Sequence, residues 1–290
     1  MNQSIDVLPD HKKTQLYRLR HSLSHILATA VRQMRPEVKL AFGPPVENGF
    51  YYDFDFGDSP LGESDLEEVE RRMSAVIKER RPFVREEKSF DEALRFLEES
   101  GEVYKVEYAR ELIDTGVANG DTLSFYSSGD FTDMCEGPHL DHTGEVPKKC
   151  FKLDRISGSY WRGDEKRPML TRIYGLAFES AQELSEYLAM RKLAMERDHR
   201  KLGEELDLFV QDNEVGVGLP LWMPKGTVIR DELEKWARET EFLGGYQRVS
   251  TPSVTRKELY LRSGHVPYYE DSMYPPMPVD ENDHYYLRPM

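Results

Sequence analysis

The pattern of apolar positions divides the first part of the chain into helix and strand. Hydrophobic residues recur at helical spacing from Gln15 to Met34 and predict one helix that stops before Pro36. Phe50–Phe56 alternates aromatic with polar residues, which predicts a strand with one solvent-facing side. Leu40–Phe42 predicts a second strand. This part of the chain therefore mixes both kinds of element.

Capping signals mark the next helices. Ser64-Asp65-Leu66-Glu67 has the form of a capping box and predicts a helix to about Arg80. Ser89-Phe90-Asp91-Glu92 repeats the signal and predicts a shorter helix that ends near Gly101. Several short strands, broken by glycine-rich turns, are expected between Val103 and Ile173.

The pattern changes again in the last third of the chain. A charged helix is predicted from Ala181 to about Leu208, then a helix from Thr227 to about Leu243 and a strand at Tyr246–Val249. The predicted fold class is α+β. The elements suggest a domain over residues 1–180, a linker helix over 181–208 and the start of a second α+β unit over 209–290.

Composition limits the class of protein. The chain is 39% hydrophobic and 32% charged, and no apolar stretch reaches the roughly 18–20 residues that a membrane span needs. The first residues show no signal-peptide layout, and two cysteines, Cys135 and Cys150, cannot form a disulfide framework. These features predict a cytoplasmic protein that contacts no membrane.

The formal net charge is −14, which by itself disfavours a nucleic-acid partner. Affinity depends on local patches, however, so the net charge does not exclude one. Three short basic clusters occur, at Arg18/Arg20, Arg80/Arg81 and Arg197–Lys201, and each alone is typical of a solvated helix face.

Two histidines in His21-Ser22-Leu23-Ser24-His25 are the first candidate for chemistry. At helical spacing both project to the same side of their helix, opposite the apolar side. A position in the core is therefore not expected for either. They are a solvated surface pair or a functional pair, and the helix alone does not decide between the two.

The second candidate is Cys135-Glu136-Gly137-Pro138-His139. Gly-Pro excludes a regular helix, so a tight loop is expected to turn Cys135 and His139 toward one point. One thiol and three imidazoles are the ligands of a tetrahedral zinc site, or the groups of a hydrolytic pocket without metal. The cysteine motif alone is weak, because an unpaired cysteine is more often a small buried hydrophobic residue. Together with His21 and His25 it favours a functional site.

Segments along nearly the whole chain resemble the editing domain and linker of bacterial threonyl-tRNA synthetases, in order and with similar spacing. They are HSLSHILATAVRQMRPEVKLAFGPPVENGFYYDFDF, GEVYKVEYA, DMCEGPHL, SYWRGDEKRPMLTRIYG and RDHRKLGEELDLF. The resemblance implies an editing domain of the threonyl/alanyl-tRNA synthetase type, a long linker helix, and a truncated antiparallel-sheet domain of a class II synthetase.

The resemblance also implies the catalytic residues of the editing pocket. These are His21, His25, Lys105, Asp133, Cys135 and His139. Without it, Lys105 would be interpreted as an exposed strand residue and Asp133 as a turn cap. The family's pocket implies editing without a metal or other cofactor. The alternative is a zinc site made of the three histidines and the cysteine, as in the related editing domain of alanyl-tRNA synthetase.

The last part of the chain resembles the opening of a class II catalytic domain. Residues 222–254 resemble motif 1, which forms the family's homodimer interface; Ile229, Leu233 and Trp236 share one helical face, also typical of core packing. Arg288-Pro289-Met290 resembles the strand before the family's zinc-binding cysteine. The resemblance implies ATP, Mg and Zn for the full-length enzyme, whose ligands are expected outside this chain. Exposed apolar surface is expected over 209–290.

The chemistry gives a reason for such a pocket. Serine lacks one methyl of threonine, which is worth only about 1–3 kcal/mol in binding, so a second site must hydrolyse mischarged seryl-tRNA. We therefore expect a threonine–tRNA ligase portion whose partner is the tRNA for threonine, with aminoacyl-tRNA hydrolase activity only. A freestanding trans-editing deacylase is disfavoured by residues 209–290, and a non-catalytic tRNA-binding module by the intact histidine and cysteine pairs.

Overall fold

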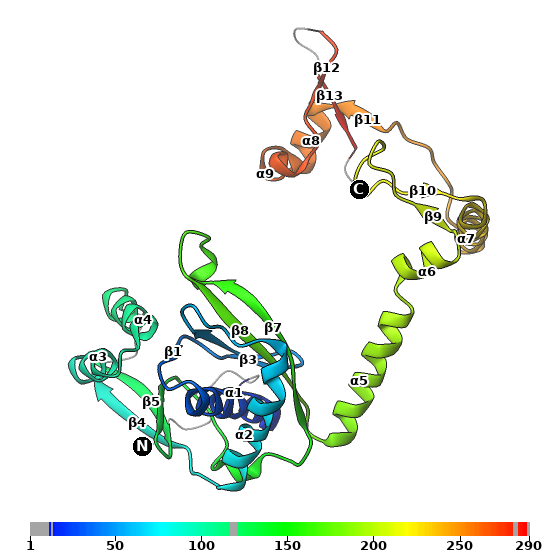
Figure 1. Ribbon diagram of the computed structural model, residues 1–290. Helices are drawn as coiled ribbons and strands as arrows, with labels where there is room; N and C mark the ends of the chain where they lie inside the picture. Colours follow the sequence, from blue (N-terminus) through cyan, green and yellow to red (C-terminus); the bar gives the residue numbers. More distant parts are fainter. Residues whose placement is uncertain (1–11, 13, 117–120, 281–283, 289–290) are drawn as a thin grey trace. The chain divides into compact units, whose positions relative to one another are not determined.

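The computed structural model describes residues 12, 14–116, 121–280 and 284–288 (Figure 1). The chain divides into two units, Met1–Glu196 and Arg197–Met290. Both combine helices with antiparallel sheets, so the predicted α+β class is confirmed. None of the helices within the described residues is long and apolar enough to cross a membrane.

The first unit is built around helix α1 (Gln15–Met34), which lies against one face of an antiparallel sheet (Figure 1). The strands follow the order β1-β3-β8-β7, and β2 also pairs with β3. Their bounds are β1 Lys39–Leu40, β2 Pro45–Val46, β3 Gly49–Asp55, β7 Phe151–Tyr160 and β8 Met169–Ala177. Helix α2 (Leu66–Lys78) packs beside α1 and completes the main core.

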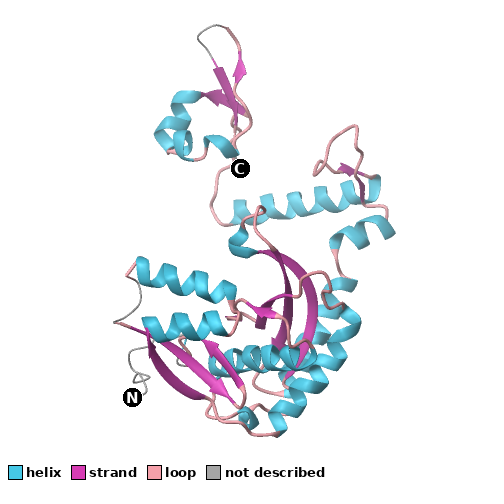
Figure 2. Cartoon of the chain, turned by 60° about the vertical axis from the view of Figure 1, so that its left-hand side comes forward, coloured by secondary structure: helices cyan, strands magenta, loops and turns pink. Residues whose placement is uncertain are grey.

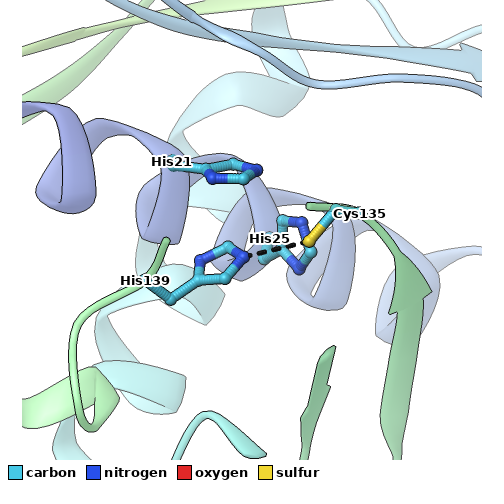
Figure 3. Close-up of side chains that lie close together, drawn as sticks. All are labelled: His21, His25, Cys135 and His139. Atoms are coloured by element: carbon cyan, nitrogen blue, oxygen red, sulfur yellow. Dashed lines mark hydrogen bonds between the residues drawn. The ribbon is translucent and has the colours of Figure 1, made fainter. Parts of the chain in front are cut away.

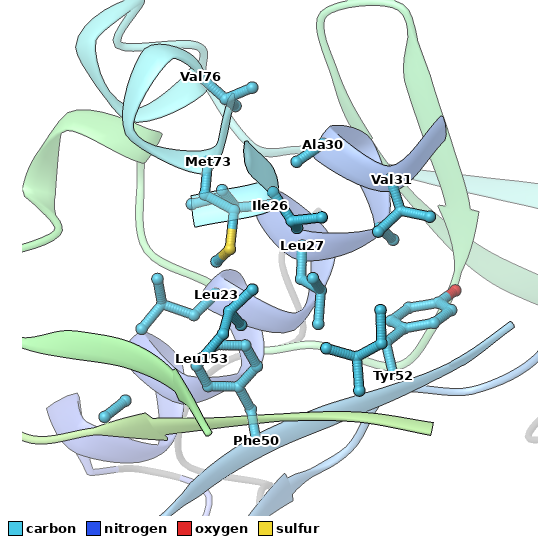
Figure 4. Close-up of a cluster of buried hydrophobic side chains, with 14 of the residues drawn as sticks. Leu23, Ile26, Leu27, Ala30, Val31, Phe50, Tyr52, Met73, Val76 and Leu153 are labelled. Atoms are coloured by element: carbon cyan, nitrogen blue, oxygen red, sulfur yellow. The ribbon is translucent and has the colours of Figure 1, made fainter. Parts of the chain in front are cut away.

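The main core joins the apolar side of α1 to the inner face of the sheet (Figure 4). Leu23, Leu27 and Phe50 are fully buried in it. The alternation predicted for β3 holds for its aromatic residues. It fails at Asp53, which is buried because Arg172 on β8 donates two hydrogen bonds to its carboxylate, at 2.6 and 2.7 Å.

A second, smaller layer contains the sheet β4-β5-β6, with helices α3 and α4 (Figure 2). The bounds are β4 Val84–Ser89, α3 Phe90–Glu99, α4 Val103–Asp114, β5 Thr122–Ser128 and β6 Phe131–Met134. The capping box predicted at Ser89 is present, with Glu92 closing it. The strand expected from Val103 is wrong: β-branched and aromatic residues favour a strand locally, but packing of Val106 and Ala109 in the layer's core favours a helix.

The helix predicted over residues 181–208 is two helices in the structure. Helix α5 (Ala181–Glu196) belongs to the first unit and α6 (His199–Glu205) to the second. The side chain of Asp198 accepts a hydrogen bond from the Arg200 amide, which caps α6 and separates it from α5.

The second unit has a small core of Tyr260, Val266 and Tyr286. Its further elements are β9 Phe209–Val210, β10 Leu221–Trp222, α7 Pro224–Leu243, β11 Val254–Arg256, α8 Lys257–Ser263, α9 His265–Tyr268, β12 Met277–Pro278 and β13 His284–Leu287. The strand expected at Tyr246–Val249 is wrong, because that segment has no ladder partner and pairing starts at β11. Of the segment expected as a strand at 288–290, residues 289–290 lie outside the described residues.

Candidate active site

Four side chains from two distant segments converge in the first unit (Figure 3). His21 and His25 come from α1, and Cys135 and His139 from the loop after β6. One nitrogen of each histidine and the sulfur of Cys135 all lie within 4.8 Å of one another. The His139 ring centroid is 4.1 Å from that of His21 and 4.3 Å from that of His25. The convergence predicted from the two motifs is thus present.

The loop is held against α1 by hydrogen bonds to its backbone. Arg18 Nε donates to the His139 carbonyl at 2.7 Å, and the Leu140 amide donates to Ser22 Oγ at 2.9 Å. Gly137 has φ of +72°, and a Cβ there would meet the Tyr126 ring at under 3 Å. Only glycine therefore fits at the turn that brings His139 back to the helix.

The two histidines of α1 are buried, contrary to a solvated surface pair. His21 is 7% exposed and His25 is 3% exposed. The helix is covered on both sides: its apolar side faces the main core, and its histidine side faces the loop that carries His139. The polar side of the helix therefore marks an internal pocket and not the protein surface.

Burial keeps the three imidazoles neutral. It lowers the pKa of His21 to about 4, and it lowers the pKa of His25 and His139 well below the usual range, helped by the neighbouring histidines. His21 Nδ1 lies 3.2 Å from the Pro138 carbonyl. Since a carbonyl only accepts, Nδ1 carries the proton and Nε2 of His21 keeps a free lone pair.

A charged group lies beside the histidines. Lys105 forms an ion pair with Asp133, and its Nζ donates to Tyr52 Oη at 3.0 Å. Tyr52 in turn donates to Asp133 Oδ2 at 2.6 Å, and His25 Nε2 lies 3.6 Å from the same oxygen. Lys105 is 2% exposed, and burial lowers the pKa of its ammonium to about 8. The lysine expected on an exposed strand thus lies on a helix, with its side chain buried.

A cavity of about 360 Å³ opens onto these groups. His21, His25, Asp133 and Cys135 line it, whereas Lys105 and His139 are not among the lining residues. Lys105 reaches its wall through Tyr52 and Asp133, and His139 through Cys135, whose sulfur is 3.2 Å from His139 Nε2. The structure therefore brings all six predicted residues together, four as lining and two behind it.

The expectation of a pocket that needs no cofactor is contradicted by this arrangement. The three histidines and Cys135 are the donor set of a tetrahedral zinc site, and their donor atoms are already gathered within 4.8 Å. The neutral imidazoles suit a metal, because each already has one unprotonated ring nitrogen whose lone pair can bind the ion. Burial raises the pKa of Cys135 to about 12, so its sulfur is a neutral thiol until a cation displaces the proton.

Sequence reasoning missed two residues of the site. Tyr52 was assigned only to the inner face of its strand, although it is the one hydroxyl among the inward aromatic residues of that strand. A buried tyrosine hydroxyl usually finds a polar partner, and here the partners are Asp133 and Lys105. Ser22, between the two histidines, contacts His139 Nδ1 at 3.2 Å.

Comparisons with known proteins relate the chain to a family. The profile of the family described as "Threonyl and Alanyl tRNA synthetase second additional domain" matches residues 123–174. The chain is 45% identical over 287 residues to the threonine–tRNA ligase of Anoxybacillus flavithermus, which covers 99% of this chain and 43% of that protein. Identity to the threonine–tRNA ligase of Gloeobacter violaceus is 44% over 278 residues, or 96% of this chain and 43% of the relative. The chain spans less than half the length of these curated relatives.

Proposed function

The chain corresponds in sequence to the N-terminal portion of the threonine–tRNA ligase family. From this premise we propose that its first unit is an editing domain, which hydrolyses the ester between serine and the tRNA for threonine. One observation carries the proposal. Neutral histidines and a buried lysine–aspartate pair meet at a single cavity inside the first unit. In this proposal residues 1–180 form the editing domain.

Hydrolysis of the ester needs a positioned water, a group that takes its proton, and positive charge for the developing oxyanion. His21 meets the second need, because its free Nε2 lone pair accepts a proton or orients the ribose hydroxyl. Lys105 meets the third, since with a pKa of about 8 it is mainly cationic at neutral pH. Its low exposure strengthens its interaction with an oxyanion.

Asp133 and Tyr52 would hold the aminoacyl group. The Asp133 carboxylate accepts from Lys105 and Tyr52 and adjoins the cavity, so it can also accept from the ammonium group of serine. Burial raises the pKa of Tyr52 well above its usual range, which keeps its hydroxyl a donor. Cys135 and His139 would shape the wall and limit the room for the extra methyl of threonine.

A zinc ion is compatible with the same pocket. His21, His25, Cys135 and His139 would hold it, and when bound it would supply Lewis-acid polarisation of a water or carbonyl oxygen. The Nε2 lone pair of His21 would then belong to the metal, so His21 would accept a proton only in the metal-free pocket. Lys105, Asp133 and Tyr52 keep their positions outside this donor set.

For the full-length protein we propose the activity named for its relatives, the charging of tRNA with threonine. ATP and Mg would belong to that reaction. Helix α7 would contribute to a homodimer through the exposed side chains of Ile229, Leu233 and Trp236. A cytoplasmic location accompanies this proposal.

The test is deacylation of seryl- and threonyl-tRNA, both on the tRNA for threonine, by the purified 290-residue chain. We expect rapid loss of serine and retention of threonine. Parallel reactions with a chelator, and with zinc restored, measure the contribution of the metal. Tight tRNA binding without hydrolysis, in a folded sample, would replace the proposal with a non-catalytic binding module.

A further inference from the structure

A buried carboxylate precedes the pocket lysine on the same helix. Glu102 is the N-cap residue of α4 and is 5% exposed, yet its side chain makes no capping hydrogen bond. Its backbone carbonyl accepts from the amides of Lys105 and Val106, at 3.0 and 2.9 Å. Its backbone thus belongs to the turn that carries Lys105, while its side chain is free to bind elsewhere.

The side chain binds two other elements. Its carboxylate forms an ion pair with Arg32 of α1, and its other oxygen accepts from the Leu40 amide of β1 at 3.1 Å. Helix α1 also carries His21 and His25, and β1 pairs with β3, which carries Tyr52. One carboxylate therefore joins the first turn of α4 to the elements on which the rest of the pocket is built.

Arg32 extends the connection to strand β6. Its guanidinium lies 5.6 Å from the Phe131 ring of β6, the strand that carries Asp133. The Phe131 ring is in turn 5.9 Å from the His25 ring. The pair Glu102–Arg32 thus contacts α1, α4, β1 and β6.

The pair also balances charge beside the pocket. Glu102 and Asp133 are the anions, and Arg32 and Lys105 are the cations. Glu102 raises the pKa of Lys105 and Arg32 lowers it, both by less than burial does. The other titratable groups that face Lys105 are Tyr52 from β3, His25 from α1 and Cys135 after β6, all kept neutral by burial.

We infer that Glu102 is a positioning residue for the editing reaction: held by Arg32 and the Leu40 amide, it fixes the first turn of α4 so that Lys105 meets Asp133 and Tyr52. The inference rests on the proposed editing function. The role differs from that of an ordinary buried ion pair, because the turn that Glu102 holds is the one that carries the pocket cation.

The chain offers a matched control in Asp53–Arg172. The carboxylate of this pair is also buried and hydrogen-bonded at both oxygens. Both bonds come from Arg172, so the side chains join β3 to β8 and the carboxylate does not hold the turn that carries Lys105. Glu102→Gln keeps the shape and an acceptor for Leu40, and Asp53→Asn removes the same charge from the control pair. If weaker folding alone lowers the rate of deacylation, the rate should fall to a similar extent in both variants.

The experiment measures kcat, KM and the pH profile of seryl-tRNA deacylation for Glu102→Gln, Arg32→Gln, the double variant and Asp53→Asn. We expect Glu102→Gln to lower kcat by about tenfold or more with KM nearly unchanged, since small misplacement of a catalytic group is costly. The alkaline fall in activity should move to lower pH in Glu102→Gln, to higher pH in Arg32→Gln, and back toward the wild type in the double variant. Wild-type kcat and pH profile in Glu102→Gln, or equal changes in Asp53→Asn, would overturn the inference.

A second measurement separates this inference from the proposed function. NMR of the lysine side chains across a pH series, with the Lys105 signal assigned by its loss in Lys105→Met, reports the titration of Lys105 without any tRNA or access of a reagent. We expect the pKa of Lys105 to be lower than in the wild type in Glu102→Gln and higher in Arg32→Gln. If the wild type does not deacylate but these shifts occur, the editing proposal fails while the coupling of Glu102 to Lys105 stands; unchanged titration overturns the coupling itself.

Discussion

Helices α1 and α7 have the same length, 20 residues, but very different surroundings. Twelve residues of α1 are buried, from Leu19 to Val31, whereas in α7 only Gly226 is buried. Both sequences carry apolar residues at helical spacing. The difference teaches that periodicity identifies the helix and one apolar side, but what covers each side depends on distant segments of the chain.

The largest expected difference between the two helices is in stability. Leu27→Ala should lower the free energy of unfolding of the first unit by about 2–5 kcal/mol, because Leu27 is fully buried in the main core. Leu233→Ala should change that of the second unit by no more than about 0.5 kcal/mol, because Leu233 is 59% exposed. Hydrogen exchange in urea, followed peptide by peptide at low protein concentration, measures both. Equal losses would show that α7 is covered in solution.

The chemistry should depend on the first unit alone. Lys105→Met keeps the bulk of the side chain but removes its charge, and should lower the rate of seryl-tRNA hydrolysis by about 10²–10³-fold. Lys152→Met, an exposed position on β7, is the control and should leave the rate unchanged. A similar rate in both variants would remove Lys105 from the reaction.

Zinc should stabilise one unit and not the other. A ligand that binds only the folded state, at a free concentration of 100 times its Kd, raises the free energy of unfolding by about 2.7 kcal/mol. We expect zinc to raise the Tm of the first unit by binding His21, His25, Cys135 and His139. His139→Asn should abolish the rise and His142→Asn, outside the cluster, should preserve it. A rise that persists in His139→Asn would place the metal elsewhere.

The smallest effect concerns pH. Burial lowers the pKa of Lys105 to about 8, so its ammonium is charged below that pH and neutral above it. Because the charged form is the proposed active form, hydrolysis should fall about tenfold per pH unit above 8. The measurement is the enzymatic rate after subtraction of spontaneous ester hydrolysis. A rate that rises through this range would make neutral Lys105 the active form.

Local signals in the sequence predicted much of the first unit. The apolar repeat predicted α1 to its last residue, and the capping box at Ser89 predicted α3, because each depends on residues within a few positions. The two motifs indicated that His21, His25, Cys135 and His139 would meet, since a tight turn and one helix face restrict where side chains point.

The failures arose where distant contacts decide the outcome. Helix α4 was expected as strand, since its packing in the core of the second layer is not visible in its own sequence. The histidines of α1 were not expected to be buried, because the loop that covers them lies more than a hundred residues away. Glu102 showed no local signal, since its partners Arg32 and Leu40 belong to other elements.

Helix α1 contacts the main core with one side and the pocket with the other. A substitution at Leu23 or Ile26 that shifts this helix also displaces His21 and His25, because a helix moves as a rigid rod. Under the proposed editing function, selection for accurate translation should therefore restrict the choice of side chains at these core positions. Met73 of α2 is equally buried in the main core, but its helix carries none of the six pocket residues. It should therefore accept a wider range of replacements.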